Sequence, residues 1–154
     1  STMPSPLTSA TSFPLADRTD ERGDPRTSNA GGRNWVLFIE DRPDDSELYA
    51  ERLQAAGLNV ITAPTGGQGL AKAVALQPAI VVLDLMLPDV DGWDVCEQLR
   101  KEPRTSEIPV VILTARYESG LRQRAHDLGC AGYLTKPCDI QSLTNEIHRV
   151  LGKS

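Results

Sequence analysis

The segment Ala79-Ile80-Val81-Val82-Leu83-Asp84 decides the fold of this chain. Its first five residues are apolar without interruption, which is typical of a strand that is covered on both faces by other elements. The run ends in a carboxylate at Asp84, and an amphipathic segment follows from Gly92 to Lys101. This pattern predicts a buried strand that ends in an acid and is followed by a helix.

Short apolar runs alternate with amphipathic segments along the whole chain beyond Arg33. We expect strands at residues 35–39, 58–63, 79–83, 110–113 and 132–134, and helices at residues 44–56, 66–77, 92–101, 119–128 and 139–151. Apolar residues repeat at helical spacing most clearly in the last of these segments. Asp139 precedes this repeat and is the expected N-cap. Strands that alternate with helices predict an α/β fold, with a five-stranded parallel sheet and right-handed crossovers.

Residues 1–33 differ in composition from the rest of the chain. They are rich in Ser, Thr, Pro, Asp and Arg, and their few apolar residues are too scattered to bury a face. We expect this stretch to be a disordered tail. The opening Ser1-Thr2-Met3 resembles an expression scar, and the tail is alternatively a linker from a longer protein. A chain of 154 residues leaves room for one domain, which we place at residues 34–152.

Composition excludes several classes of function. The formal charge is −5, and no cluster of Lys and Arg is present, so direct binding to nucleic acid is not expected. The three cysteines lack metal-ligand spacing, which is typical of reduced thiols in a cytosolic protein. No apolar run approaches the roughly 20 residues of a membrane span, and no signal peptide opens the chain. We therefore expect a cytoplasmic protein that does not bind membranes.

Polar side chains follow four of the five predicted strands. These are Glu40 and Asp41 after the first, Asp84 after the third, Thr114 after the fourth, and Thr135 and Lys136 after the fifth. In open parallel sheets, chemistry sits outside the carboxyl ends of the strands, where the strand order reverses. If the second strand lies at an edge of the sheet, the other four ends converge on one crevice.

The residue types at these strand ends point to phosphoryl chemistry. Three carboxylates in one crevice repel one another unless a cation offsets their charge, and Mg²⁺ prefers such oxygen ligands. Lys136 and Thr114 would supply a positive charge and a hydroxyl donor to a transferring phosphoryl group. A carboxylate can itself be the nucleophile, and Asp84 is the best candidate because its strand is the most hydrophobic.

From about Asn34 to Leu151 the chain resembles a bacterial two-component response regulator receiver domain of the CheY-like superfamily. The motifs are Val36-Leu37-Phe38-Ile39-Glu40-Asp41, Val81-Val82-Leu83-Asp84-Leu85-Met86-Leu87-Pro88-Asp89, Asp91-Gly92, Leu113-Thr114-Ala115 and Gly132-Tyr133-Leu134-Thr135-Lys136-Pro137. Each motif is weak alone, but their order and spacing together are specific. The resemblance implies a flavodoxin-like receiver fold, with strand order 2-1-3-4-5 and five helices on both faces of the sheet.

The resemblance also implies a phosphorylation site and a metal site. Asp84 would be the phosphoacceptor, Asp41 would bind Mg²⁺ directly, and Glu40 would orient water around the ion. The backbone carbonyl of Met86 would complete the protein ligands. Glu40 replaces the commoner Asp of the family, which lengthens the reach of that carboxylate by one methylene.

Further roles follow for the fourth and fifth strands. Thr114 would follow the phosphoryl group on activation, Lys136 would bind it, and Tyr133 would change rotamer with the switch. Pro137 would follow a peptide bond that is commonly cis in the family. Met86 and Arg116 would flank the path of the attacking water and alter the phosphoryl lifetime, or they merely pack or point to solvent.

The function implied by the resemblance is that of a signalling switch and not an enzyme. The phosphoryl group would come from a histidine kinase or a phosphotransfer protein, and autodephosphorylation would end the signal. The fourth helix, fifth strand and fifth helix would present a changed face to a partner or to a second copy in a homodimer. The chain is either a stand-alone receiver or a piece of a larger regulator or hybrid kinase.

Two alternatives compete with this interpretation. A haloacid dehalogenase-type phosphatase needs a second Asp two positions after the nucleophile, but Met86 stands there. A receiver-like interaction module that is never phosphorylated is disfavoured, because every expected site residue type is present.

Three further features have simple structural interpretations. Gly66-Gly67-Gln68-Gly69 resembles a phosphate-binding loop, but it lacks the Lys-Ser/Thr ending and is expected to begin a helix. Asp44 and Asp45 would favour the dipole of the first helix. Trp93, at the start of the third helix, is expected to pack or to be partly exposed, and not to contact a cofactor.

Overall fold

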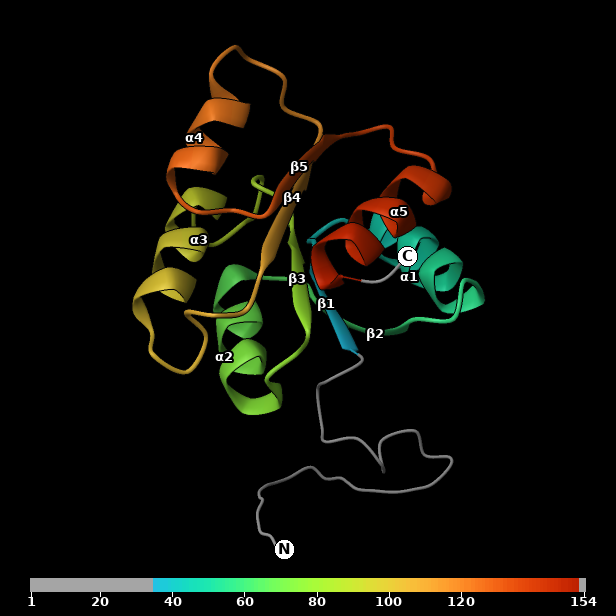
Figure 1. Cartoon of the computed structure of the whole chain (residues 1–154), viewed down its shortest axis with the longest axis horizontal. Helices are drawn as coiled ribbons and strands as arrows, with labels where there is room; N and C mark the ends of the chain where they lie inside the picture. Colours follow the sequence, from blue (N-terminus) through green and yellow to red (C-terminus); the bar gives the residue numbers. More distant parts are fainter. Residues whose placement is uncertain (1–34, 153–154) are drawn as a thin grey trace, which may run out of the picture.

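The computed structural model describes residues 35–152, in which five parallel strands form one sheet in the order β2-β1-β3-β4-β5 (Figure 1). The strands are β1 (Trp35–Ile39), β2 (Asn59–Ala63), β3 (Ile80–Leu83), β4 (Val110–Thr114) and β5 (Gly132–Thr135). The expected order is confirmed, and β2, the strand without a polar end, lies at an edge. The tail predicted at residues 1–33 lies outside the described residues.

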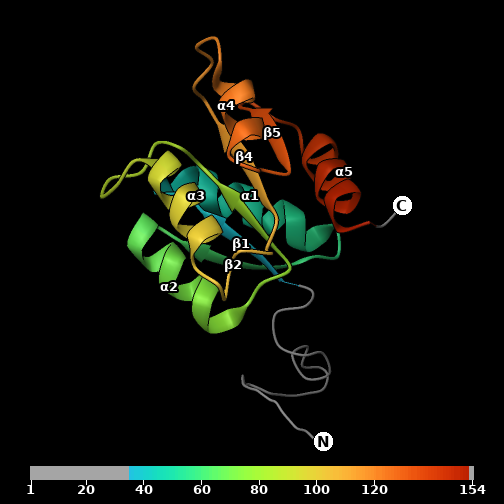
Figure 2. The ribbon, with the colours of Figure 1, turned by 60° about the vertical axis from the view of Figure 1, so that its left-hand side comes forward.

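Five helices cover the two faces of this sheet, as Figures 1 and 2 show. They are α1 (Pro43–Ala55), α2 (Gly66–Leu76), α3 (Gly92–Lys101), α4 (Leu121–Asp127) and α5 (Ile140–Leu151). Helices α2, α3 and α4 pack on one face, and α1 and α5 pack on the other. Among residues 35–152, no helix combines the length and the apolarity that a membrane crossing requires.

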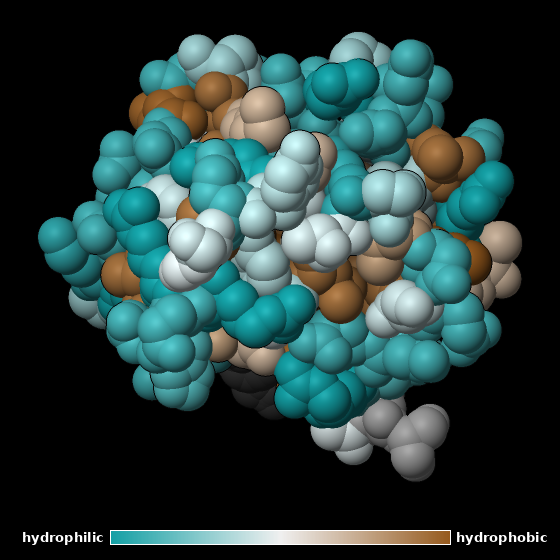
Figure 3. Space-filling view, turned by 90° about the horizontal axis from the view of Figure 1, so that it is seen from above, coloured by the Kyte–Doolittle hydropathy of each residue, from teal (hydrophilic) through white to brown (hydrophobic). Residues whose placement is uncertain are grey.

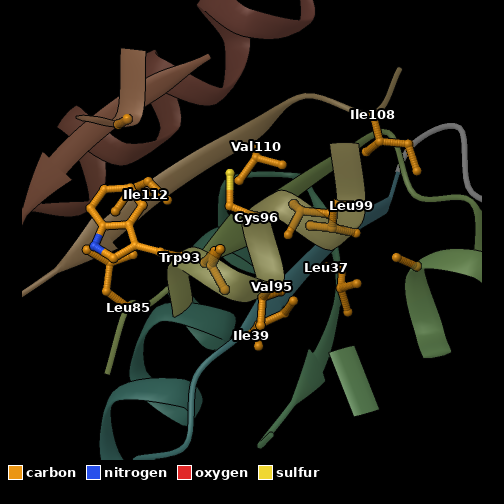
Figure 4. Packing of buried hydrophobic residues seen from close by; sticks show 14 of the residues in the cluster. Leu37, Ile39, Leu85, Trp93, Val95, Cys96, Leu99, Ile108, Val110 and Ile112 are labelled. Carbon is orange, nitrogen blue, oxygen red and sulfur yellow. The ribbon is translucent and has the colours of Figure 1, made fainter. Parts of the chain in front are cut away.

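The alternation of side chains along the strands divides the interior into two hydrophobic clusters. In β1, Leu37 and Ile39 point toward α2 and α3, whereas Val36 and Phe38 point toward α1 and α5. All four residues of β3 are buried, as expected for a central strand covered on both faces. Figure 4 shows the first cluster, in which Trp93 is fully buried, and its predicted packing role is confirmed.

Helix ends follow the capping residues of the sequence. The side chain of Asp139 accepts a hydrogen bond from the backbone N–H of Ser142 at 2.8 Å, which confirms the predicted N-cap of α5. The predicted start of the fourth helix at Ser119 is wrong by two residues. Gly120 adopts a left-handed conformation with φ +90°, so the helix begins at Leu121.

Helix α2 begins at Gly66, as predicted, and its first turn contacts a loop that is distant in sequence. The carboxylate of Asp89 accepts hydrogen bonds from the backbone N–H groups of Gly66 and Gly67, each at 2.9 Å. The amides that resembled a phosphate-binding loop are therefore paired with a side chain of the β3–α3 loop. This pairing holds the loop that follows Asp84 against α2.

Gly92 fixes the other end of the β3–α3 loop. Its N–H donates to the carbonyl of Leu85 at 3.0 Å. A Cβ at this position would overlap the Cα of Leu85 and lie 2.9 Å from the carbonyl oxygens of Asp84 and Leu85. Only glycine allows this close approach of backbone to backbone.

We predict that Gly92→Ala destabilises the domain by about 1–3 kcal/mol, because the loop backbone must move away from the new methyl group. Urea unfolding of the parent and the variant measures this loss. Gly67→Ala is the matched control, because a Cβ there meets only the Asp89 carboxylate, at 3.4 Å. Equal stability of Gly92→Ala and the parent would show that the loop yields freely.

Candidate functional site

Three carboxylates meet at the carboxyl ends of the adjacent strands β1 and β3. Ile39 pairs with Leu83 in the sheet, so the next residues, Glu40 and Asp84, lie side by side. Oxygen atoms of Glu40, Asp41 and Asp84 all lie within 4.8 Å of one another. Glu40 is 1% exposed and Asp84 is 2% exposed, while Asp41 is half-buried. The predicted convergence is therefore present for the ends of the first and third strands.

Backbone amides and burial set the electrostatics of these acids. Asp84 Oδ1 accepts from the N–H of Met86 at 3.0 Å, and Glu40 Oε2 accepts from the N–H of Arg42 at 3.1 Å. Burial raises the pKa of Glu40 to about 7, although its hydrogen bonds with Lys136 and Arg42 act in the opposite direction. The site thus places carboxylates in a buried position, where the negatively charged form of Glu40 is disfavoured.

Lys136 supplies the positive charge at this cluster. Its Nζ donates to Asp84 Oδ2 at 3.2 Å, to Asp45 Oδ2 at 2.9 Å, and to Glu40 Oε1. Burial alone would lower the pKa of Lys136, but the hydrogen bonds with Glu40 and Asp45 and the negative charges of Asp84 and Glu40 together outweigh it, and the pKa is raised. The Lys136-Pro137 peptide bond is cis, as the family resemblance implied. Lys136 therefore stays charged beside Asp84.

Asp45 is a residue of this network that sequence reasoning missed. The sequence indicates only an acid that favours the dipole of the first helix. In the structure its carboxylate, in the first turn of α1, bonds to Lys136, which follows β5. No local pattern in the sequence distinguishes Asp45 from its neighbour Asp44, which is exposed.

The donor set fits a hard divalent cation. The carboxylate groups offer only oxygen ligands, and two of the three acids are buried in a position where a cation would offset their repulsion. Met86 adjoins the cluster, because its backbone N–H donates a hydrogen bond to Asp84. Met86 is 54% exposed. The role of the Met86 carbonyl as a metal ligand stays a prediction.

Thr114 and Tyr133 are connected through the backbone of Arg116. Thr114, the fully buried last residue of β4, accepts from the Arg116 N–H at its Oγ1, at 3.3 Å. The Tyr133 hydroxyl donates to the carbonyl of Arg116, also at 3.3 Å, and the Tyr133 residue is 7% exposed. The Arg116 guanidinium lies 3.4 Å from Glu118. One loop residue thus contacts both predicted switch residues.

Figure 3 looks from above Figure 1 onto the end of the sheet where these side chains gather. This face is largely hydrophilic, with small hydrophobic patches between the polar residues. Met86 and Tyr117 are exposed hydrophobic residues of the loops that follow β3 and β4.

The sequence of this chain matches a known protein family. A model of the response regulator receiver domain matches residues 36–148. RpaA of Synechocystis, a DNA-binding dual master transcriptional regulator, is 41% identical over 119 residues, which are 77% of this chain and 49% of RpaA. Protein PilH of Pseudomonas aeruginosa is 35% identical over 121 residues, which cover 75% of this chain and 96% of PilH.

The fold is shared with solved structures as well. The chemotaxis protein CheY4 of Vibrio cholerae superposes with a TM-score of 0.71 at 26% identity, over 79% of this chain and 99% of CheY4. This chain spans about half the length of RpaA but nearly all of PilH and CheY4. The family match, the sequence identity and the shared strand order agree. The chain belongs to the response regulator receiver domain family, whose members are signalling switches of two-component systems.

Proposed function

We propose that this receiver domain accepts a phosphoryl group on Asp84 from a histidine kinase or a phosphotransfer protein, with Mg²⁺ as cofactor. The observation that carries this proposal is the position of the Asp84 carboxylate, which is buried beside two further acids and bonded to Lys136. Burial of two acids, Glu40 and Asp84, around one lysine has a cost in stability. A site for a cation and a phosphoryl group accounts for that cost.

The transfer itself requires few protein groups. An Asp84 oxygen attacks phosphorus, the bond from phosphorus to the donor imidazole nitrogen breaks, and the electron pair of that bond stays on the nitrogen. Lys136 is placed to neutralise a phosphoryl oxygen, because its Nζ already lies 3.2 Å from Asp84. Mg²⁺, when bound by Glu40, Asp41 and Asp84, would neutralise further charge on the phosphoryl oxygens. Water would later hydrolyse the aspartyl-phosphate, which ends the signal.

We predict that a small-molecule phosphoryl donor such as acetyl phosphate modifies the parent protein with Mg²⁺ but leaves Asp84→Asn unmodified. Intact mass spectrometry measures the added phosphoryl group. Asp89→Asn is the matched control, because Asp89 is an exposed acid of the same loop that contacts α2 and not the cluster. Incorporation into Asp84→Asn would exclude Asp84 as the acceptor. No incorporation into the parent would favour an interaction module that is never phosphorylated.

The roles of Asp41 and Lys136 are separable by experiment. We predict that Asp41→Asn weakens Mg²⁺ binding by roughly tenfold or more, because the site loses a direct ligand. Lys136→Ala should keep Mg²⁺ binding but weaken the binding of beryllofluoride, a phosphoryl mimic. Calorimetric titration measures both affinities.

Asp45→Asn is the control for these variants, since Asp45 contacts Lys136 without belonging to the carboxylate cluster. It should leave the Mg²⁺ affinity close to that of the parent. Unchanged Mg²⁺ affinity in Asp41→Asn would remove Asp41 from the metal site. A parallel loss of both ligands in Lys136→Ala would contradict the separation of roles.

We further propose that phosphorylation acts on the face formed by α4, β5 and α5 through Thr114, Arg116 and Tyr133. In the structure the Tyr133 ring is already buried, and its hydroxyl donates a hydrogen bond to the Arg116 carbonyl. A phosphoryl group on Asp84 adds about −1.5 to −2 of charge and would attract the Thr114 hydroxyl. This would favour the conformation with Tyr133 buried over one in which the ring points outward. The face would then be presented to a partner or to a second copy of the chain.

We predict that beryllofluoride with Mg²⁺ shifts amide resonances of residues 114–135 as well as those beside Asp84. Thr114→Ala should still bind the mimic but lose the shifts around Tyr133, because the contact with the Arg116 N–H is gone. Thr135→Ala is the control, since Thr135 is an exposed threonine at the end of the neighbouring strand. A full response in Thr114→Ala would exclude this route of coupling.

A further inference from the structure

Two cysteines from distant parts of the chain lie in contact outside the carboxylate site. Cys96 is in α3, and Cys130 is in the turn between α4 and β5, 34 residues later. Their Sγ atoms are 3.1 Å apart, and one thiol donates a hydrogen bond to the other. A disulfide bond needs a separation of about 2.05 Å, so the two sulfur atoms must move together by only about 1 Å.

The surrounding structure holds both cysteines in this position. Cys96 is fully buried and packs in the cluster shown in Figure 4. The backbone N–H of Cys130 donates to the carbonyl of Ala125 at 2.9 Å, and Ala131 N–H donates to Val110 at 2.7 Å. Elements that meet only in the folded protein therefore bring the two thiols together.

Small oxidants can reach this pair from the solvent through Cys130. Cys130 is half-buried and lines a surface hollow of about 240 Å³ between α4, β5 and α5, together with His126, Tyr133 and Arg149. Cys96 lies behind it, away from the solvent. The arrangement is that of an accessible sulfur with a second, protected sulfur in contact with it.

A guanidinium group lies beside the pair. Arg100, one helical turn after Cys96, has an Nε atom that is buried and has no hydrogen-bond partner within the described part of the chain. The hydrogen bond from Cys130 is the main cause that lowers the pKa of the Cys96 thiol, with the charge of Arg100 contributing. The pKa of Cys130 is raised by the same hydrogen bond and by burial. The lowered pKa suits Cys96 to attack a sulfenic acid on Cys130, the sulfur that lines the hollow.

We propose that Cys96 and Cys130 are a modification site, at which a peroxide converts the two thiols to an intramolecular disulfide. The Cys130 sulfur attacks hydrogen peroxide, the O–O bond breaks, and the departing hydroxide takes the Cys130 thiol proton, so that a sulfenic acid and one water form. The Cys96 sulfur then attacks the Cys130 sulfur and displaces the hydroxyl as a second water. The two thiol protons leave in these waters, and the peroxide takes up the two electrons that the sulfur atoms lose.

The cross-link would join α3 to the turn that precedes β5. It would close a loop of 34 residues and so reduce the conformational entropy of the unfolded chain. The oxidised protein should therefore be more resistant to urea than the reduced protein. The turn also borders the face of α4, β5 and α5, so the cross-link would restrict movement there.

The test treats the full chain with hydrogen peroxide and counts free thiols after denaturation by maleimide labelling and mass spectrometry. The reduced protein has three cysteines, and we expect one, Cys138, to remain after oxidation. Peptide mapping should join Cys96 to Cys130, the chain should stay monomeric on a non-reducing gel, and the urea midpoint should rise. Three remaining thiols, or cross-links only between chains, would overturn the proposal.

Variants make the assignment specific. Cys130→Ser should abolish the internal cross-link and the rise of the urea midpoint, whereas Cys138→Ser should keep both. Cys138 is the matched control because it is half-buried like Cys130 but lies against the other hydrophobic cluster. Asp84→Asn should also keep the cross-link, so the result is separate from phosphorylation. A rise of the midpoint in oxidised Cys130→Ser would show that another modification causes it.

Discussion

The buried charges around Lys136 are the interaction on which the rest of this domain depends. Two acids at adjacent strand ends are removed from water, which would cost several kcal/mol for each charge without a partner. Lys136 offsets this cost by reaching from the end of β5 to the ends of β1 and β3. The fold thus keeps a concentrated negative charge at one point and holds one lysine beside it. That arrangement limits the cost of the burial, and it agrees with the proposed site for a cation and a phosphoryl group.

The loops around this charge cluster are fixed to the helices on either side. Asp89 holds the β3–α3 loop to the first turn of α2, and Gly92 lets its other end approach the backbone of Leu85. On the opposite side, the backbone of Arg116 contacts both Thr114 and Tyr133. A displacement at Thr114 therefore has a direct physical path to the aromatic ring on β5, through one residue and two hydrogen bonds.

The two hydrophobic clusters have different chemical contents. The cluster beneath α1 and α5 contains Phe38 and Tyr49 with their rings in edge-to-face contact. The cluster beneath α2, α3 and α4 contains the contacting thiols of Cys96 and Cys130. Because the thiol of Cys96 in α3 contacts the thiol of Cys130 in the turn before β5, this cluster contains a pair of oxidisable groups as well as packed side chains. It lies apart from the carboxylates at the strand ends.

The sequence by itself determined the alternation of strands and helices, because the apolar period of each segment is local information. It also determined that Glu40, Asp41, Asp84, Thr114 and Lys136 lie at or directly after the ends of strands, and the family resemblance supplied the strand order. Only the tertiary structure decided which residues from separate elements meet. The pairs Asp45 with Lys136, Asp89 with Gly66, and Cys96 with Cys130 are far apart along the chain. Such contacts depend on the packing of whole helices against the sheet, and no local pattern encodes them.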